Sequence, residues 1–226
     1  MEIPLQAAVL GLACTGTLAI YNLDRLRDLP RDRLTAPERS AFVERHARPL
    51  TASTVVAAAA SLVLGVAAGW RVIAVAAGVM VFGLAHRRLK QRPWVKPLYL
   101  TLSWSAVVVG LPIAADPGAH NVLWVAGIVA LTVQANVTLS NLRDDEGAAA
   151  QLGRRRALLV AAGLLLVAAL LSLTGAPSLR PLIWLPAAMG AAVAAFRPGE
   201  RYGLIVVDGA LLAGALLALL GSRVSS

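Results

Sequence analysis

The chain has 226 residues, of which 58% are hydrophobic and only 15% are charged, and its mean hydropathy is +0.71. A soluble domain carries about a quarter charged residues, so this composition excludes an ordinary soluble protein and predicts an all-α, polytopic membrane helical bundle. The formal net charge is +9, but the basic residues lie in short loops between apolar runs, without the aromatic-and-basic segment that a nucleic-acid partner would need.

Apolar runs follow one another along the chain and predict about eight transmembrane helices in a single domain, residues 1–226. Several of the runs are close to the ~17-residue lower limit for crossing a bilayer. Only a Gly69-Trp70-Arg71 corner separates the second run from the third, so a count that differs by one stays open. The runs cover residues 3–21, 51–69, 69–85, 98–114, 121–140, 157–174, 181–196 and 202–221.

Lysine and arginine are divided unevenly between the two sides of this predicted bundle. If successive loops alternate sides, 18 of the 21 basic residues fall on one side, which the positive-inside rule places in the cytoplasm, with both termini outside. We therefore expect an integral protein of a bacterial inner (plasma) membrane. The cytoplasmic loops are expected at about residues 22–50, 86–97, 141–156 and 197–201.

The first cytoplasmic loop contains a helix-start signal. Thr35-Ala36-Pro37-Glu38 combines a capping hydroxyl, a proline in the first turn and an early acid, a pattern typical of a helix N-terminus. It predicts an amphipathic helix over residues 37–48 that lies over the cytoplasmic mouth of the bundle.

Three aspartates, Asp24, Asp28 and Asp32, end the first apolar run and form what we call the first acidic cluster. Steps of four residues place them on one face of a helix. Like charges so close repel one another unless a cation or a basic group stands among them. Pro30 disfavours continuation of the helix, which leaves open a turn at Asp32.

A second acidic cluster, Asn141-Leu142-Arg143-Asp144-Asp145-Glu146, closes the fifth apolar run. Each cluster continues a polar stripe that runs back into the membrane, and polar side chains there are costly unless they face a partner or a water-filled cavity. Two such stripes predict a shared cavity open to the cytoplasm. In the alternative interpretation, Thr and Ser bond their own helix backbone and the acids pair with nearby arginines. The stripes consist of Thr17, Tyr21, Asp24 and Asp28, and of Thr132, Asn136, Ser140 and Asp144.

Carboxylates in this position suit Mg²⁺, which binds one or two of them, keeps several waters and takes further ligands from substrate phosphates. A diphosphate substrate follows from that chemistry. Lys90 and Arg92 of the second cytoplasmic loop, with Arg143 beside the second cluster, are expected to neutralise the remaining phosphate charge. Basic residues at a membrane surface also serve simply as anchors and topology signals.

These residues resemble the UbiA superfamily of intramembrane prenyltransferases. The family's first motif has the form Asn-Asp-x-x-Asp-x-x-x-Asp; Asp28 and Asp32 match its last two aspartates, while Asp24 and Arg25 stand where the family has asparagine and aspartate. The second cluster is similar to the family's Asp-Ile-Arg-Asp-x-Glu-Gly-Asp run, where only Asp144 keeps its carboxylate, since Asn141 and Ala148 replace the others. Leu89-Lys90-Gln91-Arg92 is similar to the family's basic Leu-Lys-Arg element.

The resemblance implies an enzyme that uses Mg²⁺ and an isoprenyl diphosphate to alkylate a lipid-soluble, typically aromatic, acceptor through an allylic carbocation. Asp28, Asp32 and Asp144 are the implied catalytic residues, and with Asp24 and Asp145 they are the implied metal ligands. The missing carboxylates at Arg25, Asn141 and Ala148 leave open a single Mg²⁺, a terpene cyclase, or a non-catalytic homologue that binds a membrane lipid or a partner. The expected substrate contacts are Tyr21, Asn22, Arg25, Lys90, Arg92, Asn136, Asn141 and Arg143.

Overall fold

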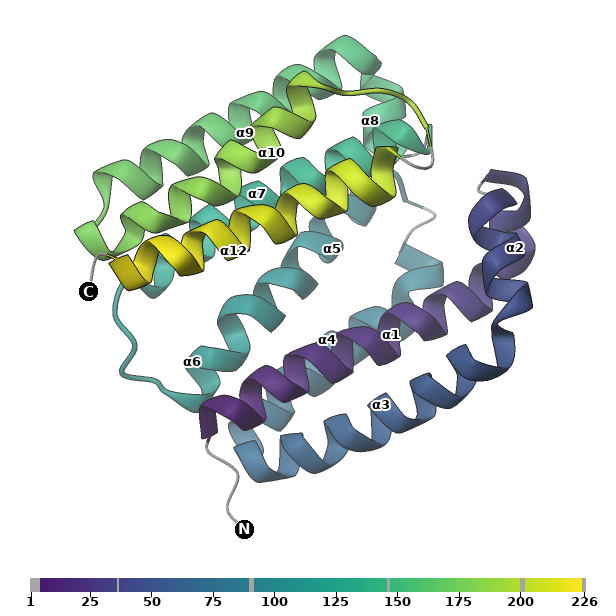
Figure 1. The fold of residues 1–226 in the computed structure, drawn as a ribbon, viewed down its shortest axis with the longest axis horizontal. Coiled ribbons are helices and arrows are strands. Elements are labelled where there is room, and N and C mark those ends of the chain that lie inside the picture. Colours follow the sequence, from purple (N-terminus) through teal and green to yellow (C-terminus); the bar gives the residue numbers. More distant parts are fainter. Residues whose placement is uncertain (1–4, 36, 90–91, 146, 200–201, 225–226) are drawn as a thin grey trace. The chain divides into compact units, whose positions relative to one another are not determined.

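The computed structural model describes residues 5–35, 37–89, 92–145, 147–199 and 202–224, and within these ranges the chain is helical with no strand (Figure 1). The expected all-α class is therefore confirmed. Short irregular helices accompany the α-helices: π-helical turns at Ala106–Gly110 and Gly203–Val207, and a 3-10 helix at Pro177–Ile183. The α-helices are α1 Leu5–Thr35, α2 Pro37–Arg45, α3 Ala47–Ala68, α4 Trp70–Leu89, α5 Val95–Ser105, α6 Leu111–Ala115, α7 Val122–Arg143, α8 Gly147–Leu152, α9 Arg154–Thr174, α10 Trp184–Ala194 and α12 Asp208–Val224.

Six helices in the described ranges are long and apolar enough to cross a membrane, which fits an integral membrane protein. The expected third and seventh crossings are not among them. The apolar part of α4, Trp70–Ala85, is shorter, and α10 has only 11 residues. The six segments are Leu5–Pro30, Ala47–Ala68, Val95–Ala115, Val122–Arg143, Arg154–Thr174 and Ile205–Arg223.

The chain divides into two compact units. Unit 1 consists of Met1–Ala85 and Ala106–Gly118, and unit 2 consists of His86–Ser105 and Ala119–Ser226. The chain passes from unit 2 back to unit 1 at Ser105, where α5 gives way to a π-helical turn. The first acidic cluster belongs to unit 1 and the second to unit 2.

In unit 1, α1 and α3 lie side by side (Figure 1). Two polar contacts join them: Asn22 Nδ2 donates to Ser53 Oγ at 3.0 Å, and Ser61 Oγ donates to Thr15 Oγ1 at 2.9 Å. Interhelical hydrogen bonds of this kind help to hold helices together where lipid supplies no hydrophobic driving force. The buried core of the unit consists of Val9, Leu12, Val72 and Leu111.

The predicted corner between the second and third apolar runs is present at Gly69. Its φ is +96°, and it separates α3, which ends at Ala68, from α4, which begins at Trp70. Side chains with a Cβ rarely adopt this conformation, so the glycine permits the break between two apolar helices.

In unit 2, α7 packs against α9, and α10 packs against both α9 and α12. The approach of α12 to α10 is close enough that a Cβ on Gly214 would lie 2.8 Å from the carbonyl oxygen of Trp184. The Tyr202 hydroxyl donates to the Ala192 carbonyl oxygen, and burial raises the pKa of Tyr202, so the phenol remains a donor at neutral pH. The core cluster of the unit consists of Ala135, Leu139, Ala161, Leu165, Met189, Ala192, Phe196 and Val207.

Two boundaries differ from the sequence expectation. Helix α1 continues through Pro30, so Asp32 lies on the helix and not on a turn. Pro30 costs α1 one backbone hydrogen bond, but contacts of Asp32 described below oppose fraying of that end. The predicted helix over residues 37–48 begins at Pro37 as expected, yet it ends at Arg45, and the chain turns at His46 into α3.

Candidate functional site

The first acidic cluster follows one face of α1 as the four-residue steps predict. Asp28 is buried, with 7% of its surface exposed. Asp32 Oδ2 accepts from Arg25 Nη1 at 3.1 Å and from Arg39 Nη2 at 2.9 Å. Two basic side chains therefore lie among the three acids: Arg25 of α1 and Arg39 of α2.

Arg25 stands where the resemblance leads one to expect an aspartate, and two side chains contact it. Its guanidinium carbon lies 4.9 Å from the centre of the Tyr21 ring, a cation–π distance, and its Nη1 bonds Asp32. Its Nε is buried and has no hydrogen-bond partner in the described part of the chain. Arg25 thus keeps one N–H donor available for an acceptor atom.

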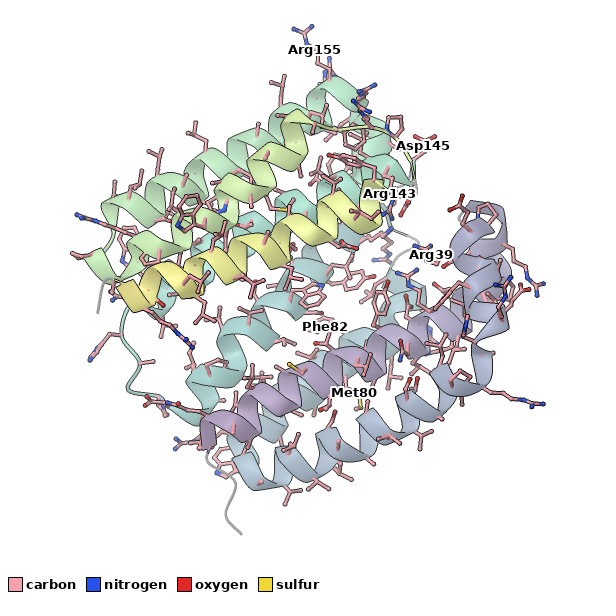
Figure 2. All side chains as sticks on the ribbon, in the orientation of Figure 1. Arg39, Met80, Phe82, Arg143, Asp145 and Arg155 are labelled. Carbon is pink, nitrogen blue, oxygen red and sulfur yellow. The ribbon has the colours of Figure 1, made fainter. Side chains whose placement is uncertain are left out.

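The second acidic cluster contains a bidentate ion pair between neighbours. Arg143 Nε and Nη2 donate to the two carboxylate oxygens of Asp144 at 2.7 and 2.8 Å. This guanidinium lies over Gly203, where a Cβ would stand 1.7 Å from Arg143 Nη1. Figure 2 labels Arg143 at the end of α7 and Asp145 beyond it. A Cβ at position 203 would therefore require the Arg143 side chain to move.

Asn141 is 3% exposed and lies against Gly147, whose Cβ, if present, would stand 3.6 Å from Asn141 Nδ2. The Ala148 N–H donates to the Pro93 carbonyl oxygen at 3.3 Å, which ties α8 to the segment before α5. Arg92 is exposed in that segment. Lys90 and Glu146 lie outside the described residues.

The second polar stripe is occupied by structural hydrogen bonds. Thr132 Oγ1 donates to the Ile128 carbonyl oxygen of its own helix at 2.8 Å. Asn136 Nδ2 donates to the Val207 carbonyl oxygen at 3.3 Å, which joins α7 to the π-helical turn before α12. The Thr132 bond is the one that the alternative interpretation expects, in which Thr and Ser bond their own helix backbone, whereas Asn136 bonds a separate segment.

The metal ligands predicted from the sequence can be compared with the side chains that the structure brings together. Among the residues that the structure describes, no group of three or more His, Cys, Asp or Glu side chains is placed to hold a metal ion. Asp32 and Asp144 are both engaged by arginines. Asp24 and Asp28 lie one turn apart on the same face of α1.

Sequence reasoning missed three contact residues: Arg39, Ser53 and Gly203. Arg39 lies within the predicted amphipathic helix, and nothing in its spacing indicates that it reaches Asp32 on another helix. Ser53 and Gly203 carry no local signal, because each is defined by the residue that it contacts.

Asp145 provides a conformational test of the second cluster. Its φ is +51°, just after the Asp144 cap of α7. A β-branched residue is strained there, so Asp145→Val is expected to lower the free energy of unfolding by about 1–2 kcal/mol. Asp145→Asn is the matched control, since asparagine has nearly the same size, is not β-branched and adopts positive φ readily. Equal effects of the two variants on thermal unfolding would contradict the prediction.

The predicted site residues therefore form two groups, one in each unit. In unit 1, α1 carries Tyr21, Arg25, Asp28 and Asp32, and Arg39 of α2 completes the contacts. In unit 2, the end of α7 carries the Arg143–Asp144 pair. Asn22 and Asn136 each bond a neighbouring helix, Asn22 through Ser53 and Asn136 through the Val207 carbonyl oxygen. No protein-family model, curated protein or solved structure matches this chain.

Proposed function

We propose that this chain is a UbiA-like integral membrane prenyltransferase that alkylates a lipid-soluble, aromatic acceptor with an isoprenyl diphosphate. The observation that carries the proposal is Asp28, a carboxylate only 7% exposed on a helix long and apolar enough to cross a membrane. Ionisable residues are costly on such helices and mark functional sites by default. The resemblance of the flanking motif to the UbiA superfamily specifies the substrate class.

The arginines beside Asp28 support a phosphate-bearing substrate. Arg25 has a buried Nε donor with no partner in the described ranges, and Arg39 brings a second guanidinium to the same carboxylate, Asp32. Guanidinium groups bind phosphate through paired, charge-assisted hydrogen bonds. We propose that the diphosphate binds at this pair of arginines, which would supply part of the positive charge that the family takes from metal.

Asp24 and Asp28 would hold a single Mg²⁺ in this proposal. The ion, when bound, would stabilise the negative charge that develops on the departing diphosphate. Arg25 orients and neutralises the phosphate, and the Tyr21 ring beside it offers a π face to positive charge. The roles predicted for Asp144 and Arg143 in this reaction are untested by the structure.

The membrane topology is also part of the proposal. We propose eight crossings, formed by the six long apolar helices together with Trp70–Ala85 of α4 and the segment from Pro177 to Ala194. An even number of crossings, with this arginine distribution, would put both acidic clusters at the cytoplasmic face. A bacterial inner membrane is the proposed location.

A second candidate is a non-catalytic homologue that binds a lipid diphosphate without turning it over. The observation in its favour is that Asp32 and Asp144 are both bound by arginines of the same chain. An acid held in this way is less available to a metal ion than a free carboxylate.

Ligand-induced stabilisation of the purified full-length protein tests the site. Isoprenyl diphosphates of several chain lengths with millimolar Mg²⁺ are expected to raise the unfolding temperature, since a ligand at 100 times its Kd stabilises by about 2.7 kcal/mol. Asp28→Asn is expected to abolish the shift. Asp116→Asn, which alters an exposed aspartate on a loop, is expected to retain it. No shift with any chain length would overturn the proposal.

Release of diphosphate distinguishes the two candidates. An enzyme supplied with prenyl diphosphate and aromatic acceptors is expected to release diphosphate and to lose that release in Asp28→Asn. A non-catalytic homologue is stabilised by the same ligand but releases none.

A further inference from the structure

An apolar groove of about 390 Å³ runs between α9 and α10 in unit 2. Every residue that lines it is apolar or glycine. Several of the lining side chains are exposed, including Ala162, Leu166, Ala187 and Ala194, so the groove opens at the surface of the chain. Because α9 is one of the six long apolar helices, the groove would face lipid hydrocarbon, and its contents must be apolar.

Arginines gather where this pair of helices ends. Helix α9 begins with Arg154, Arg155 and Arg156, and Arg197 follows the end of α10; all four are exposed. Arg154 ties the two helix ends together, because its Nη2 donates to the Phe196 carbonyl oxygen at 3.3 Å and its guanidinium lies 5.4 Å from the centre of the Phe196 ring. Positive charge and an apolar groove therefore lie on the same pair of helices.

Helical register places one of these arginines above the groove. Arg155 precedes Ala162 by seven residues, two full turns, so the two share a face of α9, and they are separated by about 10 Å along the axis. Leu166 and Ala169, which also line the groove, continue that face. Arg156 points about 100° away. Figure 2 shows Arg155 extending beyond the end of α9.

We propose that α9 and α10 bind an anionic phospholipid, with its phosphate at Arg155 and one acyl chain in the groove. The headgroup layer of a bilayer is several ångströms thick on each side of the hydrocarbon, which matches the step from the exposed arginine to the apolar lining. Gly153 provides no side-chain cap to α9, so the first backbone N–H groups also point toward the same phosphate. The site is independent of the proposed prenyl transfer, because it shares no residue with the acidic clusters.

The charge requirement is tested with two neighbouring variants of the full-length protein in detergent. Phosphatidylglycerol is titrated and compared with phosphatidylcholine of the same acyl chains, with thermal stabilisation and bound lipid as readouts. Arg155→Gln is expected to weaken binding of phosphatidylglycerol about fivefold, the effect of one interfacial charge. Arg156→Gln removes the same charge from another face and is expected to change binding less than twofold. Inorganic phosphate alone is expected to give no stabilisation.

The role of the groove is tested by substitutions at two glycines where an added Cβ meets no other atom. Gly190 lines the groove, whereas Gly163 does not, and a Cβ on either would meet nothing within 4 Å. Gly190→Leu is expected to abolish the preference for phosphatidylglycerol, and Gly163→Leu is expected to keep it. Asp28→Asn is expected to bind phosphatidylglycerol as the wild type does, which separates this site from the proposed prenyl transfer.

Two results would overturn the proposal. One is an equal loss in Arg155→Gln and Arg156→Gln, which would mean that the arginine run acts only as a surface charge. The other is equal affinity of the wild type for the anionic and zwitterionic lipids. The first comparison uses two surface substitutions and the second uses the wild type, so both decide the matter even if Gly190→Leu fails to fold.

Discussion

Gly203→Ala is expected to lower the free energy of unfolding by about 2–4 kcal/mol, the sum of overpacking and a lost charge-assisted pair. The new Cβ would stand 1.7 Å from Arg143 Nη1 and 2.5 Å from its Cδ. Because the clash reaches Cδ as well as the guanidinium, the outer part of the Arg143 side chain must move. That movement breaks the bidentate bond to Asp144, whose two contacts measure 2.7 and 2.8 Å.

Two controls separate this clash from a general effect of alanine. Gly209→Ala adds the same methyl group in α12, where a Cβ meets nothing within 4 Å, and is expected to be neutral or stabilising because alanine favours helix. In an Arg143→Ala background, Gly203→Ala is expected to cost less than 1 kcal/mol, since the clashing side chain is gone. If the cost were unchanged in that background, Arg143 would not be its cause. Thermal and chemical unfolding of the purified protein measure all four variants.

Asp32→Ala is expected to lower the free energy of unfolding by about 2 kcal/mol, between the values for exposed and fully buried ion pairs. The Asp32 side chain is only 16% exposed and bridges Arg25 of α1 and Arg39 of α2. Its removal leaves two guanidinium groups, each less than a quarter exposed, facing each other without the carboxylate. Helix α2 then loses one of its ionic contacts with α1, and protease cleavage within α2 is expected to accelerate.

A second ion pair between the same two helices provides the control. Arg33 and Glu44 also join α1 to α2, but their side chains are 60% and 42% exposed, and exposed pairs contribute about 0–1 kcal/mol. Double-mutant cycles are expected to give a coupling of at least about 1 kcal/mol for Asp32 with Arg39 and at most about 0.5 kcal/mol for Glu44 with Arg33. Similar couplings would show that burial does not strengthen the bridge at Asp32.

The candidate site was only partly predictable from the sequence. The four-residue steps of the first acidic cluster correctly place Asp24, Asp28 and Asp32 on one helix, and the expected basic group among them is present. Periodicity did not reveal that Pro30 would be carried inside α1. In the second stripe, spacing likewise did not reveal that Asn136 bonds the Val207 carbonyl oxygen, 71 residues away along the chain.

The sequence by itself determined the helical class, the apolar segments, the break at Gly69 and the clustering of charge at helix ends. Hydropathy and helical period are local properties, and the membrane requires every long apolar run to satisfy its backbone as helix. Only the tertiary structure decided which charges meet. Arg39 reaches Asp32 from a separate helix, and Arg143 lies over Gly203, 60 residues away along the chain. Such partners depend on how helices pack, and no spacing within one helix encodes them.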